Sequence, residues 1–222
     1  MANYRNRFGI ATFCMALLLG WFAMVTIVAE TATPKAQQLS QDLTLADSTS
    51  NGSMAAWAAA VAPLRGDLLA NVAMAQASPA INLGRSPASS EIIAARELAL
   101  ASAKQSLARA PHSSGLWLLT AILQNQARPG DRNAEVLKMS YLTAPADVSL
   151  VPARLTIVTG SAAIADDELR SLVRGDIRLI LTRRPDLKAT IASAYRRGSA
   201  EGKAAIDDVV RSLDPGFAAT LR

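Results

Sequence analysis

Two eight-residue stretches of the chain are nearly the same and lie thirty-four positions apart. Residues 104–111 read KQSLARAP and residues 138–145 read KMSYLTAP, so Lys, Ser, Ala and Pro recur at matching places. Self-similarity at this period is typical of stacked helix-turn-helix units. Each copy closes on a proline, which cannot continue a helix. We therefore expect each copy to be the last turn of a packing helix, with Lys104 and Lys138 facing outward.

The composition favours helices as well. Alanine is abundant, and the aromatic residues are only three Trp, three Tyr and four Phe among 222 residues. A core of small and aliphatic side chains suits close-packed helices better than an aromatic-rich sheet. The predicted fold class is all-α, with an N-terminal transmembrane helix followed by an array of antiparallel helical hairpins.

The N-terminal transmembrane helix is predicted over residues 8–29, which form a run of twenty-two residues without a charge. As a helix this run would be about 33 Å long, close to the thickness of the hydrocarbon layer. A cleaved signal peptide is the alternative, but its apolar region is shorter and ends in small residues. An uncleaved anchor is favoured, with Cys14 as a buried free thiol. One small-residue pair, Ala16 and Gly20, leaves helix dimerisation open.

Charges on either side of this run predict its orientation. Arg5 and Arg7 precede it and Glu30 follows it, which places the N-terminus in the cytoplasm. The Arg- and Ala-rich composition suggests a bacterium. The expected location is the bacterial inner membrane, with a single span and the C-terminal domain in the periplasm.

The rest of the chain divides by composition. The predicted segments are a cytoplasmic stub (1–7), the transmembrane helix (8–29), a polar tether (30–53), accessory helices with a loop (54–86) and a helical-repeat domain (87–222). Apolar spacing, caps and breakers predict helices over 54–78, 89–110, 115–126, 133–142, 148–158, 166–184, 187–197 and 200–213. In helix 89–110 the apolar face is expected to consist of Ile93, Leu100 and Leu107 and of a neighbouring stripe, Ile92, Ala95, Ala99 and Ala103. Asp186 is expected to cap helix 187–197.

The stretch from Trp117 to Pro145 resembles a tetratricopeptide repeat. Trp117 stands at the early aromatic position, Ala121 where the pattern prefers Gly, and Leu137 at the later aromatic position. Ser140 and the closing Pro145 follow, and Pro111 closes the preceding copy. The resemblance covers one and a half to two repeats, and it implies that Trp117, Ala121, Leu137, Ser140, Pro111 and Pro145 are packing residues.

The whole layout is similar to that of small inner-membrane proteins of bacteria with tetratricopeptide-like domains. Such proteins are often assembly or scaffold components of envelope systems, which include polysaccharide export. That resemblance implies a membrane-anchored protein with a protein partner.

Catalytic patterns are absent from the sequence. One Cys and one His exclude disulfide frameworks and Cys/His zinc sites, and no phosphate-binding or serine-hydrolase motif occurs. The acids Asp166, Asp167 and Glu168 are interpreted as a helix start rather than a metal site. We therefore expect no enzyme activity, no catalytic residue, no metal and no cofactor.

Arg170, Arg174 and Arg178 are spaced to lie on one helical face and form a candidate face for an anionic partner. Anionic polysaccharide or lipid could bind there, whereas nucleic acid is not expected because no aromatic stacking residues lie nearby. A solvated helix face, with Asp166 pairing with Arg170, is the alternative.

The sequence thus predicts a non-enzymatic, single-pass scaffold or assembly protein of the bacterial cell envelope, which binds a protein partner through a short helical solenoid. The alternative is a structural element whose basic face binds anionic polysaccharide or lipid. The residues leave the partner's identity and the oligomeric state open.

Overall fold

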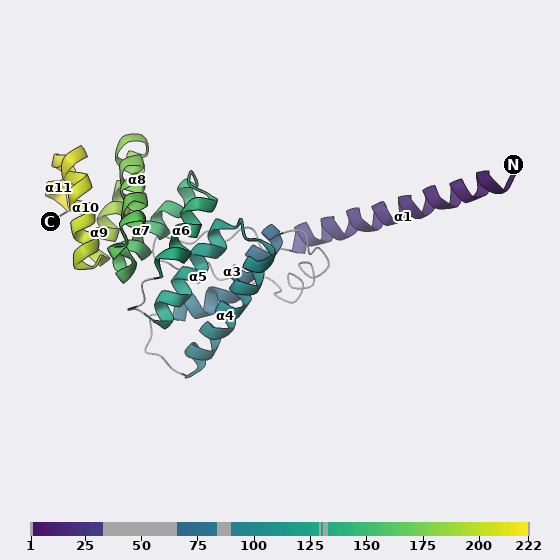
Figure 1. Cartoon of the computed structure of the whole chain (residues 1–222), viewed down its shortest axis with the longest axis horizontal. Helices are drawn as coiled ribbons and strands as arrows, with labels where there is room; N and C mark the ends of the chain where they lie inside the picture. Colours follow the sequence, from purple (N-terminus) through teal and green to yellow (C-terminus); the bar gives the residue numbers. More distant parts are fainter. Residues whose placement is uncertain (1, 33–65, 84–89, 129, 131–132, 222) are drawn as a thin grey trace.

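The computed structural model describes residues 2–32, 66–83, 90–128, 130 and 133–221 (Figure 1). These residues form α-helices, short 3-10 helices and turns, and none of them lies in a β-strand. The predicted all-α class is therefore confirmed for this part of the chain. Residues 33–53 of the predicted tether and the start of the accessory segment, 54–65, lie outside the described residues.

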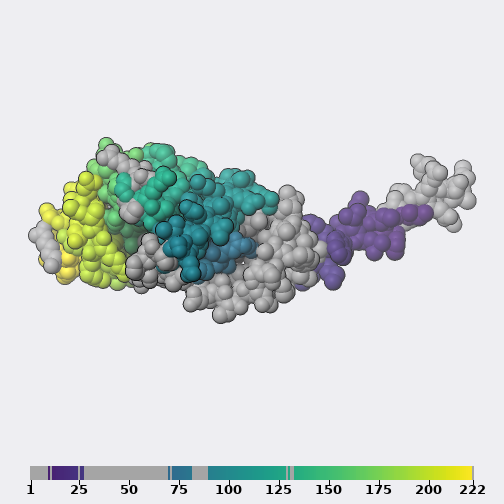
Figure 2. Space-filling view, turned by 90° about the horizontal axis from the view of Figure 1, so that it is seen from below, coloured from purple at the N-terminus to yellow at the C-terminus, as the bar shows by residue number. Residues whose placement is uncertain are grey.

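The first helix, α1 (Ala2–Ala32), extends away from the helical body (Figures 1 and 2). Large apolar side chains along it are about two-thirds exposed, among them Phe13 at 65% and Leu18 at 67%. Cys14, predicted to be buried within the membrane, is also exposed in the chain itself, because none of the other described helices packs against α1. Within the described residues, no helix is long and apolar enough to cross a membrane. The predicted span over residues 8–29 is thus not confirmed.

Four helices form the part of the body nearest α1: α3 (Gly66–Leu83), α4 (Ser90–Arg109), α5 (Ser114–Ala127) and α6 (Ala134–Thr143). Each packs against the next one in the chain, and α3 also contacts α5. The predicted end of α3 at residue 78 is wrong, because the helix continues through Pro79 to Leu83. Ala77, Ala80 and Ile81 are almost fully buried on both sides of the proline. Their packing outweighs the hydrogen bond that a proline removes from a helix.

The C-terminal half is a second set of short helices. They are η1 (Val148–Leu150), α7 (Val151–Gly160), η2 (Ala162–Ala165), α8 (Asp167–Arg183), η3 (Pro185–Leu187), α9 (Lys188–Arg197), α10 (Ala200–Leu213) and α11 (Pro215–Thr220). Helix α7 packs against α8, α9 and α10, and most of its residues are buried. Buried apolar residues from α3 to α11 form one continuous core.

Side chains cap these helices at predictable places. The Asp166 carboxylate accepts a hydrogen bond from the Leu169 N–H at 2.9 Å, and Ser199 and Asp214 cap α10 and α11 in the same way. The predicted cap at Asp186 is wrong. Residues 185–187 form a 3-10 turn instead, and the Asp186 carboxylate binds the Arg184 guanidinium at 2.7 Å. The acid therefore pairs with a preceding side chain rather than with the backbone of α9.

The core-facing side of α4 agrees with the predicted apolar face except at its edge. Ile92, Ala99 and Ala103 are buried, whereas Ile93 is 44% exposed. The predicted stripe of Ile93, Leu100 and Leu107 is therefore wrong at its first position, and Leu100 is only half-buried. The small side chains face the core because they let α3 approach α4 closely. The larger Ile93 and Leu100 lie at the edge of this contact.

Helix α10 begins directly on the end of α7. The Ser199 hydroxyl donates to the Thr159 carbonyl at 3.1 Å and accepts from the Gly202 N–H at 3.0 Å. The Ser199 N–H binds the same carbonyl at 2.9 Å. A Cβ atom at Gly202 would lie 2.9 Å from the Thr159 Cα. The two backbones are therefore so close that this position requires glycine.

Candidate functional site

The second copy of the repeated motif lies at the end of α6 and is buried. Lys138, predicted to face outward, is only 8% exposed. Its ammonium nitrogen lies 3.0 Å from carboxylate oxygens of both Asp166 and Glu168. A third carboxylate, from Glu135, lies at 3.1 Å. The prediction for Lys138 is wrong because α8 begins beside α6 and brings its acidic first turn over the lysine.

The positive charge of Lys138 and the negative charges of the surrounding carboxylates stabilise one another. The hydrogen bonds that the Lys138 ammonium donates to Asp166 and Glu168 raise the pKa of Lys138 above its ordinary value. The pKa of Asp166 is lowered, mainly by its hydrogen bond with the Leu169 N–H and then by Lys138. Lys104, the equivalent residue of the first copy, is exposed as predicted. The two lysines therefore have different surroundings despite their identical motif positions.

The residues that the repeat implied as packing residues occupy different environments. Ala121 and Leu137 are at most 2% exposed and belong to the core. Trp117 is half-buried, and its indole N–H donates to the Pro111 carbonyl at 2.7 Å. Pro145 is exposed at the end of its turn. The indole therefore joins α5 to the proline that follows α4.

Arg154 of α7 is a fully buried cation that the sequence did not indicate. Its Nε donates to the Ser140 hydroxyl at 3.1 Å, and its Nη1 donates to the Ala144 carbonyl at 3.1 Å. Nη2 donates to the Ser140 and Ala144 carbonyls. These carbonyls belong to the C-terminal end of α6, where the helix dipole favours a positive charge. Two residues of the repeated motif thus bind a cation from the next helix.

Two further titratable groups lie beside this guanidinium. The Arg154 guanidinium carbon lies 4.7 Å from the centre of the Tyr141 ring. Asp176 of α8 is 6% exposed, and its Oδ2 has no hydrogen-bond partner among the described residues. Burial raises the pKa of Asp176 to about 6, although Tyr141 and Arg154 act in the opposite direction. Burial and the Asp176 charge also raise the pKa of Tyr141.

Replacing Asp176 with asparagine should stabilise the protein at pH 8 and leave it unchanged at pH 4. The pKa of Asp176 is raised from 3.8 to about 6 on folding, so its contribution is fully present below pH 4 and is lost as the pH rises through 6. The expected gain at pH 8 is about 3 kcal/mol. Urea unfolding of D176N and the natural chain at both pH values measures it. Equal gains at pH 4 and pH 8 would contradict the expectation.

The predicted basic face is partly used inside the fold. Arg174 pairs with Asp208 of α10 at 2.8 Å, and Arg170 pairs with Asp167 at 3.0 Å. The alternative pairing of Arg170 with Asp166 is wrong, because Asp166 caps α8 and binds Lys138. Among the described residues, Arg178 has no ion-pair partner and is exposed. An anionic partner at this face stays a prediction.

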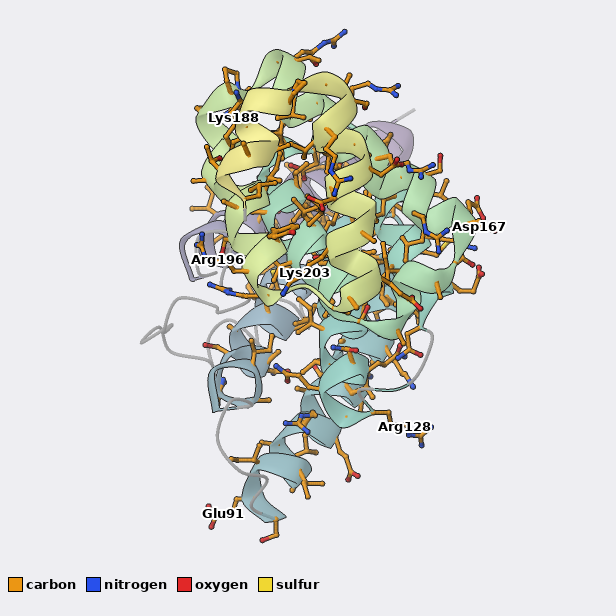
Figure 3. The ribbon with its side chains drawn as sticks, turned by 90° about the vertical axis from the view of Figure 1, so that its left-hand side faces the viewer. Glu91, Arg128, Asp167, Lys188, Arg196 and Lys203 are labelled. Atoms are coloured by element: carbon orange, nitrogen blue, oxygen red, sulfur yellow. The ribbon has the colours of Figure 1, made fainter. Side chains whose placement is uncertain are left out.

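A groove lies between α4 and the end of α5. Its volume is about 550 Å³. The residues that line it are Ile93, Arg96, Glu97, Leu100, Lys104, Gln124, Gln126, Ala127, Arg128 and Asn133. In Figure 3, Arg128 and Glu91 mark this end of the body, far from Lys188. The α4 residues recur at helical spacing and form one face, so the groove is lined by the side of α4 that does not enter the core.

The groove combines positive charge with carboxamides and two aliphatic side chains. Three of its lining residues are basic and one is acidic. The Arg96 Nη1 donates to the Gln126 carbonyl at 3.0 Å, which joins the two walls. Among the described residues, no carboxylate pairs with Lys104. The sequence did not indicate this groove, because Ile93 and Leu100 were assigned to the core.

Several polar atoms in the groove walls have no hydrogen-bond partner among the residues that the structure describes. They are the Arg96 Nε, the Gln124 Oε1 and the Gln126 Oε1, and the adjacent Asn125 Oδ1 is in the same state. Buried polar groups without a partner are rare in folded proteins, and each requires an explanation. These buried polar atoms therefore lie close together behind the wall of the groove. Comparisons with protein-family models, with curated proteins and with solved structures find no match to the chain.

Proposed function

We propose that the chain is a non-enzymatic, membrane-anchored scaffold of the bacterial cell envelope that binds a protein partner in the groove between α4 and α5. The observation that carries the proposal is this groove, with partly exposed aliphatic side chains between polar ones. Such a mixture is typical of recognition surfaces, which combine apolar contact with a few placed polar groups. The tetratricopeptide-like interpretation of residues 117–145 adds a hairpin array as the rigid support.

The anchor in this proposal is the apolar run over residues 8–29. The run carries no charge, and the described apolar side chains of α1 are not covered by the body. Exposed apolar surface of this extent requires a lipid or protein environment. The proposed orientation, with the helical body in the periplasm, follows from Arg5 and Arg7 before the run.

Photocrosslinking in the native cells tests the anchor and the groove together. A benzoylphenylalanine replaces Ile93 in the full chain, and membranes are washed with carbonate before analysis. We expect one dominant cross-linked protein, retained in the membrane fraction, because Ile93 lines the groove and is 44% exposed. The captured protein is then purified, and its binding to the full chain is measured directly.

The same photoreactive residue at Leu98 is the matched control. Leu98 lies on the same helix, is 73% exposed and does not line the groove. Equal products from the two positions, or a captured protein that does not bind after purification, would refute binding in the groove. Release of the chain by carbonate would refute the anchor alone.

A further inference from the structure

We propose that the groove between α4 and α5 accepts an extended peptide segment of acidic character from the partner protein. This inference rests on the proposed function and specifies which kind of segment the groove holds. The contributing features are the cations Arg96 and Lys104, the carboxamides Gln124 and Gln126, and the aliphatic floor formed by Ile93 and Leu100.

Charge is the first argument. Three basic side chains and a single acidic one, Glu97, line the groove. Lys104 is exposed on α4 and has no carboxylate partner among the described residues. Carboxylates on a bound segment would pair with the Lys104 ammonium and would be attracted by the positive charge of the groove before contact. A basic segment would be repelled.

The carboxamides indicate the conformation of the segment. The Oε1 atoms of Gln124 and Gln126 are hydrogen-bond acceptors without donors. Rotation about the terminal side-chain bond is soft and can turn a carboxamide toward the groove. A bound helix satisfies its own backbone N–H groups, whereas an extended segment leaves them free to donate. The acceptors therefore favour an extended segment over a helix.

The aliphatic floor separates peptide from other acidic polymers. Ile93 and Leu100 provide an apolar contact for a β-branched or aliphatic side chain, and alternate residues of an extended segment point to opposite sides. Valine side chains could thus face the floor while acidic ones reach the basic rim. No aromatic residue lines the groove, so base or sugar stacking has no platform there.

Fluorescence anisotropy with the full chain in detergent tests this. The probe is a fluorescein-labelled peptide, Glu-Val-Asp-Val-Glu-Val-Asp, and the comparison peptides are Lys-Val-Lys-Val-Lys-Val-Lys and a stapled helix of equal negative charge. We expect the acidic extended peptide to bind at least about tenfold more tightly than either. Lys104→Glu should weaken its binding by about tenfold, whereas Arg196→Glu, with the same change in net charge at an exposed position on the distant α9, should not.

Gln124→Met separates a role of Gln124 in peptide binding from a role in stability. This change removes an unpaired buried acceptor, so the unfolding midpoint should stay the same or rise. Binding of the acidic peptide should nevertheless fall by about tenfold. Tighter binding of the basic or helical peptide, of oligouridylate or of polygalacturonate would overturn the inference, as would equal effects of Lys104→Glu and Arg196→Glu. If the inference fails but the photocrosslinking experiment still captures a partner in the groove, the proposed function remains supported.

Discussion

Replacing Arg154 with methionine should lower the free energy of unfolding by about 3 kcal/mol. The guanidinium satisfies the Ser140 and Ala144 carbonyls at the end of α6 and packs on the Tyr141 ring. Methionine keeps most of the side-chain length but donates no hydrogen bond, so these acceptors would remain buried without a partner. Burial lowers the pKa of Arg154, yet an arginine stays charged at neutral pH, and the Asp176 carboxylate would lose its neighbouring cation.

Urea unfolding of the full chain, followed by far-UV circular dichroism, measures this loss. Arg174→Met is the control, because its ion pair with Asp208 is exposed and should contribute less than about 1 kcal/mol. Adding D176N to R154M should recover part of the loss at pH 8, since it removes the unbalanced buried carboxylate. A loss below about 1 kcal/mol for R154M would show that water or other groups replace the guanidinium.

Gly202→Ala should destabilise the protein by about 3 kcal/mol or more, because the added methyl group has no space. Its carbon would lie 2.8 Å from the Thr159 carbonyl carbon and 2.9 Å from the Thr159 Cα. Backbone atoms cannot turn away as a side chain can, so α10 would have to shift from α7. That shift would break the hydrogen bonds between Ser199 and Thr159.

Gly175→Ala is the matched control for this change. Gly175 lies inside α8, and a Cβ there would meet nothing within 4 Å. Alanine should therefore stabilise the helix by about 0.5 to 1 kcal/mol. Thermal unfolding should move the two variants in opposite directions from the natural chain. A Gly202→Ala protein as stable as the natural chain would disprove the close contact between α7 and α10.

Helix positions could be predicted where the signals are local. Asp166 marks the start of α8 and Pro185 stops it, and both act through the nearest turn of backbone. The same holds for Ser199 and Asp214, whose side chains cap α10 and α11. Asp186 also looks like a cap, but it has a closer partner in Arg184. Local sequence shows that a side chain can cap a helix, and competition among neighbours decides whether it does.

Contacts between distant helices could not be predicted in this way. Lys138 stands at the same motif position as Lys104, but Glu135 on its own helix and the acidic first turn of α8 give it different surroundings. Arg154 is one of eighteen arginines, and the sign of its burial in the sequence is that no other charged residue stands between Val148 and Ala165. A long, flexible, charged side chain is normally predicted to be exposed. Its burial depends on the carbonyls that α6 presents to α7.

The groove between α4 and α5 could not be predicted from the sequence for a related reason. Apolar residues at heptad spacing, such as Ile93, Leu100 and Leu107, predict a core face of a helix. A second apolar stripe one position away, at Ile92 and Ala99, competes for the same role and faces the core instead. With both stripes present, spacing alone does not decide which one packs. Arg96 and Lys104 lie on the same side of the helix as Ile93 and Leu100. Charged residues at these positions indicate that this side of the helix is open to solvent.

The bond between Arg154 and the end of α6 limits how the chain can be lengthened. Repeat proteins commonly gain or lose whole units, because each unit contacts only its neighbours. An extra hairpin inserted after residue 145 would separate the guanidinium from the Ser140 and Ala144 carbonyls and leave both sides buried without partners. Such an insertion should therefore destabilise the protein, so the junction between α6 and α7 has no room for an added element.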